Sequence, residues 1–234
     1  MSLRYSILGD DLQVLEVQLA PGESIRSETG AMLFMDDGIE MSASTGGILK
    51  GLKRAVAGDG LFITSFTNRS DGVKRLAFSA PFPGKILPLD LNEINGQLLC
   101  QRGAFLCGES DVEIKVAFTK RLGAGFFGGE GFILQRLKGR GTVFIHAGGA
   151  LITRDLGAGE SINVDTGCIV AFSRDVDYDI RFVGGVRNAI FGGEGLFLAR
   201  LTGPGRVYLQ SLPLSRLADR ILQGRVVSSK SNSD

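Results

Sequence analysis

Short runs of apolar and alternating residues recur along most of the chain, and glycine-rich turns separate them. Examples are LQVLEVQL (12–19), GFILQRL (131–137), TVFIHA (142–147) and RVYLQSL (206–212). Such runs are typical of β-strands, and the segments between them, among them PGES, NRSDG and GPG, favour tight turns. A turn at about every 8–12 residues favours an all-β sandwich or barrel over the alternating strands and helices of a parallel sheet.

One helix is expected, near the C-terminal end, over residues 214–226. Leu214, Leu217, Ile221 and Leu222 lie on one face of this segment, with arginines opposite. The last residues, 227–234, are polar and are predicted to be disordered.

The strand pattern belongs to a sequence unit that occurs three times in the chain. FFGGEGFILQRLKGRGTVFI, which begins at Phe126, and IFGGEGLFLARLTGPGRVYL, which begins at Ile190, agree at most positions without a gap. LAPGESIRSETGAMLFM from Leu19 and LGAGESINVDTGCIVAF from Leu156 are a second ungapped pair. The third copies are AGDGLFITSF, which ends at Phe66, and a degraded LNEINGQLLCQRGAFLC, which ends at Cys107.

Self-similarity at a nearly constant spacing is the signature of a repeat architecture. We therefore predict one repeat-built β domain over residues 1–213, with units at about 5–80, 81–149 and 150–213. Each unit contains both of the repeated elements.

Composition narrows the class of protein. The chain has 234 residues, of which 34 are glycine and 6 are proline, while 44% are hydrophobic and 22% charged. These fractions suit a globular protein and exclude collagen-like and proline-rich disordered chains. The formal net charge of +1 gives no global signal for nucleic acid, so no DNA partner is expected.

The cysteines and the start of the chain point to the cytoplasm. Cys100, Cys107 and Cys168 lie among apolar residues without C-x-x-C spacing, which suits buried thiols in a reducing compartment. Asp10 and Asp11 precede any apolar stretch of signal-peptide length. No apolar run approaches the ~18–20 residues of a spanning helix, so no stable membrane insertion is expected.

Candidate chemistry is sparse because the chain has one histidine, His146. A histidine-cluster metal site is thereby excluded, and we expect the imidazole to be satisfied by neighbouring backbone. No G-x-S-x-G pentapeptide occurs, so a serine hydrolase elbow is absent. We expect no metal and no cofactor, and we expect that the chain is not an enzyme.

The glycine motifs carry a family resemblance. The G-G-x-x-x-G-x-x-R stretch at 46–54 leads into GDGLFITSF, and GGEGFILQRLKGRGTVFI and GGEGLFLARLTGPGRVYLQS follow. Together they resemble the altered-inheritance-of-mitochondria family, over about Tyr5 to Pro213. The resemblance implies repeated double-stranded β-helix-like sandwich units, a fold similar to the tryptophan RNA-binding attenuation protein, and a homotrimeric ring.

The same resemblance implies little about activity. Prokaryotic members of the family have no established biochemical role, and fungal mitochondrial members are tied to inner-membrane architecture and respiratory-complex integrity without being enzymes. No catalytic residues come with it. The middle unit departs from its neighbours because it has Arg102 where they have Thr29 and Thr166, so a site built from the acidic-Thr-Gly turn is expected to be lost there.

Each unit also contains a glycine–acid–glycine turn. The glycines are Gly58, Gly60, Gly129, Gly131, Gly193 and Gly195, and the acids between them are Asp59, Glu130 and Glu194. We expect these glycines to be structural, since they permit left-handed turns and close backbone approach. Two alternatives are phosphate binding, which lacks the required following helix, and a ring of carboxylates that collects Ca²⁺ or Mg²⁺.

The most basic segment is GGILKGLKRAVAGDG, residues 46–60, in which Lys50, Lys53 and Arg54 accompany apolar residues. It is a candidate contact for a partner or an anionic membrane surface. A structural role at a subunit interface is the favoured interpretation, because three charges do not anchor a protein stably to a membrane.

These observations predict a non-catalytic oligomeric scaffold or interaction module, expected to be a homotrimer that covers its strand edges by closing a ring. Association with membranes or respiratory complexes rests on the family resemblance. The alternative is a small-molecule-binding protein with an apolar site between β-layers. RNA binding is the weakest reading, since aromatic and basic residues are not interleaved.

Overall fold

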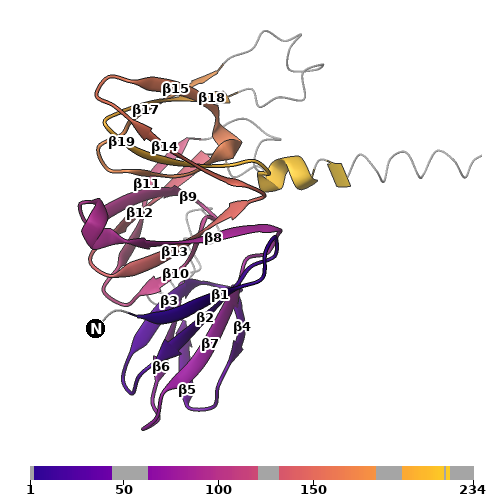
Figure 1. The fold of residues 1–234 in the computed structure, drawn as a ribbon, viewed down its shortest axis with the longest axis vertical. Coiled ribbons are helices and arrows are strands. Elements are labelled where there is room, and N and C mark those ends of the chain that lie inside the picture. Colours follow the sequence, from indigo (N-terminus) through magenta and orange to yellow (C-terminus); the bar gives the residue numbers. More distant parts are fainter. Residues whose placement is uncertain (1–2, 44–62, 121–131, 183–196, 219, 222–234) are drawn as a thin grey trace, which may run out of the picture.

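Nineteen strands dominate the part of the chain that the computed structural model describes, namely residues 3–43, 63–120, 132–182, 197–218 and 220–221. Their order is visible in Figure 1. The strands are β1 (Arg4–Leu8), β2 (Val14–Leu19), β3 (Ser24–Glu28), β4 (Met32–Met35), β5 (Ile39–Ala43), β6 (Ile63–Asn68), β7 (Lys74–Ser79), β8 (Gly84–Asp90), β9 (Gln97–Gln101), β10 (Phe105–Glu109), β11 (Glu113–Lys120), β12 (Phe132–Lys138), β13 (Thr142–Gly148), β14 (Leu151–Leu156), β15 (Ser161–Asp165), β16 (Ile169–Ser173), β17 (Asp177–Phe182), β18 (Phe197–Thr202) and β19 (Gly205–Gln210).

Helical structure in the described residues is confined to short segments. Two 3₁₀-helices, η1 (Leu91–Ile94) and η3 (Thr166–Cys168), interrupt the strands, and residues 214–218 and 220–221 are helical. The prediction of an all-β protein with a short C-terminal helix is confirmed. Residues 222–226 of the predicted helix, and the predicted disordered tail at 227–234, lie outside the described residues.

The strands form four sheets, with the orders β1-β2-β7-β4, β5-β6-β3-β10-β13-β8, β11-β12-β9-β16-β19-β14 and β15-β18-β17. One pairing scheme recurs in three blocks, which we call block 1 (β2 to β7), block 2 (β8 to β13) and block 3 (β14 to β19). Within a block the first and third strands flank the sixth, and the second and fourth flank the fifth. Each block is therefore a sandwich of two antiparallel three-stranded layers, to which β1 adds at the edge of block 1.

The blocks are joined by strand pairing. The second strand of block 1, β3, pairs with the third strand of block 2, β10, and β9 pairs with β16 in the same way at the next boundary. Ser27 lies opposite Cys107 at the first joint, and Cys100 lies opposite Ala171 at the second. Two sheets therefore run from one block into the next, and the blocks follow one another along the long axis of the molecule (Figure 1).

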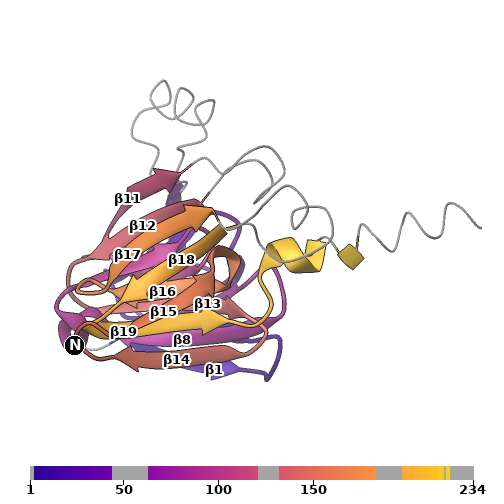
Figure 2. The same ribbon diagram turned by 90° about the horizontal axis from the view of Figure 1, so that it is seen from above.

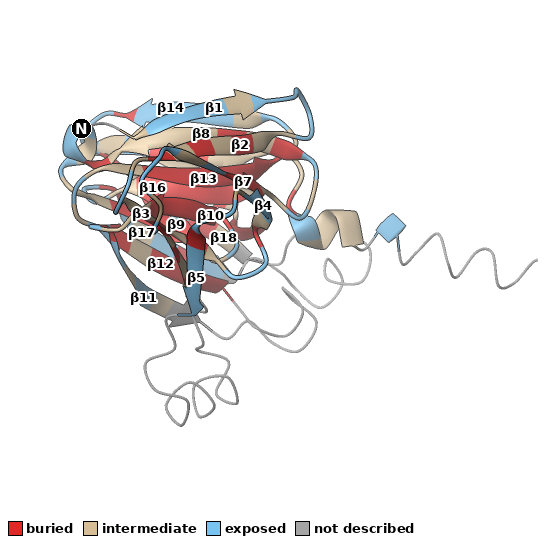
Figure 3. Ribbon diagram, turned by 90° about the horizontal axis from the view of Figure 1, so that it is seen from below, coloured by how far each residue is buried: buried red, intermediate tan, exposed pale blue. Residues whose placement is uncertain are grey.

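The position of a strand among the layers decides how many of its residues are buried. Strands at the outside alternate, as in β2, where every second residue is buried, because one face meets the core and the other meets solvent. Inner strands such as β13 are buried on both faces, because another layer packs on each side. Figure 3 shows the buried residues concentrated on these inner strands, while β1 and β14 are largely exposed.

The repeated G-E-S motif has the same role in the first and third blocks. The Glu23 carboxylate accepts a hydrogen bond from the Ala20 backbone N–H at 2.7 Å, and Glu160 accepts one from Gly157 at 2.9 Å. Gly22 and Gly159 take φ values of +80° and +77° in these turns, a conformation that glycine adopts without strain. The motif is thus a turn in which the acid satisfies a backbone donor.

Gly148, at the end of β13, is a position where the fold leaves no space for a side chain. A Cβ there would overlap the Leu212 carbonyl oxygen and lie 2.8 Å from a Phe82 ring carbon. We expect Gly148→Ala to lower the free energy of unfolding by about 1–3 kcal/mol, measured by urea denaturation followed by circular dichroism. Gly72→Ala is the matched control, because a Cβ at Gly72 meets nothing within 4 Å. Equal losses in the two variants would contradict this packing.

Candidate functional site

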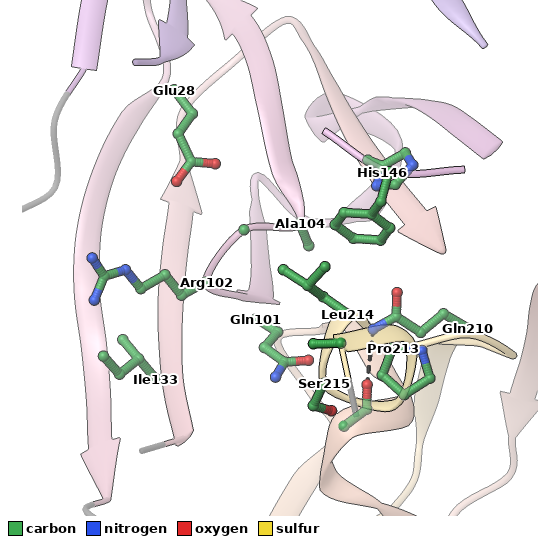
Figure 4. A pocket seen from close by; sticks show the side chains of 14 residues that line it. Glu28, Gln101, Arg102, Ala104, Ile133, His146, Gln210, Pro213, Leu214 and Ser215 are labelled. Atoms are coloured by element: carbon green, nitrogen blue, oxygen red, sulfur yellow. Dashed lines mark hydrogen bonds between the residues drawn. The ribbon is translucent and has the colours of Figure 1, made fainter. Parts of the chain in front are cut away.

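A pocket of about 410 Å³ lies where turns and strand ends of all three blocks meet the C-terminal helix (Figure 4). Block 1 contributes one residue, block 2 and the segment before it contribute half of the lining residues, and block 3 with the following helix closes the other side. The lining residues are Glu28, Phe82, Gln101, Arg102, Gly103, Ala104, Ile133, His146, Gly167, Gln210, Pro213, Leu214, Ser215 and Ala218.

The same turn of each block reaches this pocket. It connects the second strand to the third, and it contributes Glu28 from block 1, Gln101 to Gly103 from block 2 and Gly167 from block 3. Because the second strand of one block pairs with the third strand of the next, the three turns lie along one side of the molecule. Gly103 has a φ of +83° in its turn, which brings the chain back into β10.

Hydrogen bonds hold the C-terminal segment over the pocket. The Gln210 side-chain amide donates to the Gly167 carbonyl at 2.8 Å, and its oxygen accepts from the Gly148 backbone N–H at 2.8 Å. The Leu212 N–H donates to the Gly148 carbonyl at 3.0 Å, and the Arg216 guanidinium bonds the Asp165 carboxylate at 2.7 Å. Figure 2 shows the helix at one side of the strands, where it forms a wall of the pocket.

His146 is the buried titratable group of the pocket, with 3% of its surface exposed. It lies in β13, and the Phe82 ring packs edge-on against the imidazole with centroids 4.6 Å apart. Burial lowers the pKa of His146 to about 4, although a hydrogen bond to the Phe82 backbone opposes the shift. The imidazole is therefore neutral at pH 7.

The two ring nitrogens of His146 differ. Nδ1 is buried and has no hydrogen-bond partner. A neutral imidazole with its proton on Nε2 presents a lone pair at Nδ1. The sequence-based expectation that backbone satisfies the imidazole holds for one nitrogen and is wrong for the other.

A pair of opposite charges lies at the far side of the pocket from His146. Figure 4 shows Glu28 and Arg102 on one side and His146 and Gln210 on the other. Burial raises the pKa of Glu28, and the positive charge of Arg102 opposes that rise. Burial also raises the pKa of the Cys100 thiol, and the charge of Glu28 adds to the effect. Sequence reasoning noted Arg102 as a departure from its neighbours, but it missed Glu28, which comes from another block.

The site residues predicted from sequence cannot be compared with the pocket. Their positions lie outside the described residues, so their predicted roles stay predictions. They are Lys50, Lys53, Arg54, Gly58, Gly60, Gly129, Gly131, Gly193 and Gly195, together with the acids Asp59, Glu130 and Glu194.

Three further findings concern metal ligands, membrane helices and cysteines. Among the described residues no group of three or more histidine, cysteine, aspartate or glutamate side chains is placed to hold a metal ion. Within the same residues, no helix has the length and apolar character needed to cross a membrane. The three cysteines, all within the described residues, form no disulfide; Cys100 and Cys107 are buried and Cys168 is half-buried.

The chain is similar to proteins without an assigned activity. The family model described as Mitochondrial biogenesis AIM24 matches residues 5–212. An uncharacterized protein of Streptococcus pyogenes serotype M6 is 30% identical over 216 residues, which cover 88% of this chain and 84% of that protein. An X-ray crystal structure of a Streptococcus pyogenes protein, a structural genomics target, matches with a TM-score of 0.77 and 27% identity, covering 94% of this chain and 99% of the other.

The burial of His146 predicts a pH-dependent stability. The pKa is about 4 in the folded chain and near 6.5 when unfolded, so between these values the unfolded state binds more protons. The stability that neutral His146 retains above about pH 6.5 is therefore lost as the pH falls toward 4, by about 2–3 kcal/mol at pH 4.5. Urea denaturation at pH 7 and 4.5 measures the loss, with His146→Gln as the non-titrating control. Parallel pH profiles for the two proteins would contradict this account.

Proposed function

The chain belongs to the family described as Mitochondrial biogenesis AIM24, and from this premise we propose that it is a non-catalytic scaffold that closes into a homotrimeric ring. In this assembly the third block of one copy joins the first block of the next by the strand pairing that joins blocks within one chain. The observation that carries the proposal is a difference in burial between corresponding strands.

The third strand of a block is covered wherever a preceding block exists. In β10, Leu106 and Cys107 are buried beneath the pairing with β3. In β16, Val170 and Ala171 are buried beneath the pairing with β9. Leu106 and Cys107 follow Gly103 at the same distances as Val170 and Ala171 follow Gly167. The exposure of these positions can therefore be compared directly with that of the same positions in the third strand of block 1.

That strand, β4, exposes the same positions. Leu33 is 53% exposed, Phe34 41% and Met35 38%, and no described strand pairs with the outer edge of β4. An apolar edge strand is a template for pairing with another chain, and natural proteins cover such edges. A second copy of this chain offers the matching strand.

The matching strand is β15, the second strand of block 3. It lies at the edge of its sheet in the described part of the chain, whereas β3 and β9 are paired on both sides. Carrying the register of the internal joints to this edge sets Phe34 opposite Val164 of the partner subunit, and Met35 opposite Asn163 of the partner subunit. Asn163 is exposed in the single chain, while Leu99, its counterpart in β9, is 9% exposed.

Joining β4 to β15 is a head-to-tail contact, which closes into a ring or continues as a filament depending on the rotation between copies. The family resemblance supports closure at three copies. A closed ring leaves neither β4 nor β15 uncovered, and it gives each copy the same contacts.

The description of the scaffold as non-catalytic is supported by the surroundings of His146. A base that activates a nucleophile bonds the hydroxyl or thiol that it deprotonates. Here the imidazole bonds the Phe82 backbone, and its Nδ1 has no partner. We propose, by family resemblance, that the ring contributes to the organisation of membranes or respiratory complexes. The apolar surroundings of the cysteines support the further proposal that it acts in the cytoplasm.

Native mass spectrometry tests the assembly. The chain mass is 24.9 kDa, so a trimer has about 75 kDa, three times that value. We expect wild-type protein at this mass and Phe34→Lys at the mass of the single chain, because a buried unpaired charge at the joint is costly. Ile152→Lys, at a 47% exposed residue of β14, is the matched control and should stay trimeric. A monomeric wild type, or an open series of larger masses, would refute the closed ring.

The basic segment gives a separate prediction. If Lys50, Lys53 and Arg54 contact an anionic surface, wild-type protein should sediment with vesicles of anionic lipid at low salt and be released as salt rises. Replacing the three residues by glutamine should reduce the partition coefficient onto the vesicles by about a hundredfold, since each basic residue contributes on the order of 1 kcal/mol. Equal binding by the wild type and the triple variant would restrict the segment to a structural role.

A further inference from the structure

The pocket between the blocks holds a buried acceptor with nothing to bond. Nδ1 of His146 is closed off from solvent and has no hydrogen-bond partner. The residue as a whole is 3% exposed. Leaving such a group unpaired is costly, and native structures rarely carry that cost without a reason. The pocket that His146 lines is the place from which a partner would come.

The rest of the lining sets the character of such a partner. Phe82, Ala104, Ile133, Pro213 and Leu214 give the pocket a largely apolar wall. A volume of about 410 Å³ is in the range of small-molecule sites, which combine apolar walls with a few convergent polar groups.

Charge in the pocket favours a neutral molecule. The carboxylate of Glu28 and the guanidinium of Arg102 are the charged groups among the lining residues that the structure describes, and they interact with each other. Their charges offset, so neither an anion nor a cation finds an uncompensated counter-charge. The neutral imidazole adds an acceptor and no charge.

We propose that this pocket binds a small, uncharged and largely apolar molecule that donates one hydroxyl hydrogen to Nδ1 of His146. The hydroxyl satisfies the buried acceptor, and the apolar body fills the space beneath the C-terminal helix. The edge-on ring of Phe82, which is half-buried, is the group that moves aside to let the hydroxyl reach Nδ1. The site lies within one chain, so the proposal is independent of the trimer.

A matched pair of probes tests the proposal. 4-Propylphenol carries the donor, and 4-propylanisole has nearly the same apolar body with a methyl group in place of the hydroxyl hydrogen. We expect calorimetry on the wild-type chain to give about tenfold tighter binding of the phenol, the preference that one satisfied buried hydrogen bond provides. Because the chain has one histidine, its ¹⁵N resonances report directly whether Nδ1 accepts the bond.

Three variants separate the elements of the proposal. His146→Phe keeps a ring in place and removes the acceptor, so the two probes should bind within about twofold of each other. Ala218→Trp fills the pocket and should abolish binding of both, while Ile152→Trp, on exposed β14, should leave both unchanged. Thermal melting verifies that each variant is folded.

The contrary outcomes are distinct. Absence of phenol binding to folded wild-type protein would overturn the proposal, as would equal affinities of the two probes. Binding that survives Ala218→Trp would place the ligand elsewhere and overturn it as well. A monomeric wild-type protein that binds the phenol selectively would refute the trimer and leave this site standing.

Discussion

The pairing of β3 with β10, and of β9 with β16, is the interaction on which the rest of the structure depends. Each pairing joins two three-stranded layers into one six-stranded sheet, so backbone hydrogen bonds between strands hold each block to the next. The core follows from it, because layers that belong to two sandwiches at once are buried on both faces. Three hydrophobic clusters along the molecule are the result.

The same pairing creates the pocket and the unpaired edges. It aligns the turn after the second strand of every block, and these turns, with the C-terminal helix, enclose the space that His146 and Glu28 line. It also leaves β4 and β15 as the two places where the scheme stops in the described chain. The same strand-pairing scheme thus accounts for the pocket within the chain and for the apolar edge strand β4.

Much of the fold could be predicted from local sequence. Alternating apolar residues marked strands such as β2, and the G-E-S motif marked turns, because strand periodicity and turn geometry involve neighbouring residues. The 3₁₀-helix η1 was not predicted, although Asp90 caps it by accepting from Asn92. The candidate site was predicted poorly: His146 was noticed, but its partnerless Nδ1 depends on which groups surround it in three dimensions.

The sequence by itself determined the all-β class, the short C-terminal helix and the spacing of its repeated motifs, since these follow from hydrophobic periodicity and turn residues. Only the tertiary structure decided which repeats touch. Glu28 and Arg102 meet, and His146 faces the C-terminal helix, because strands distant in sequence pair in one register. The exposure of Phe34 likewise has no local signal, since its counterparts Cys107 and Ala171 occupy the same turn-to-strand position and are buried by a preceding block.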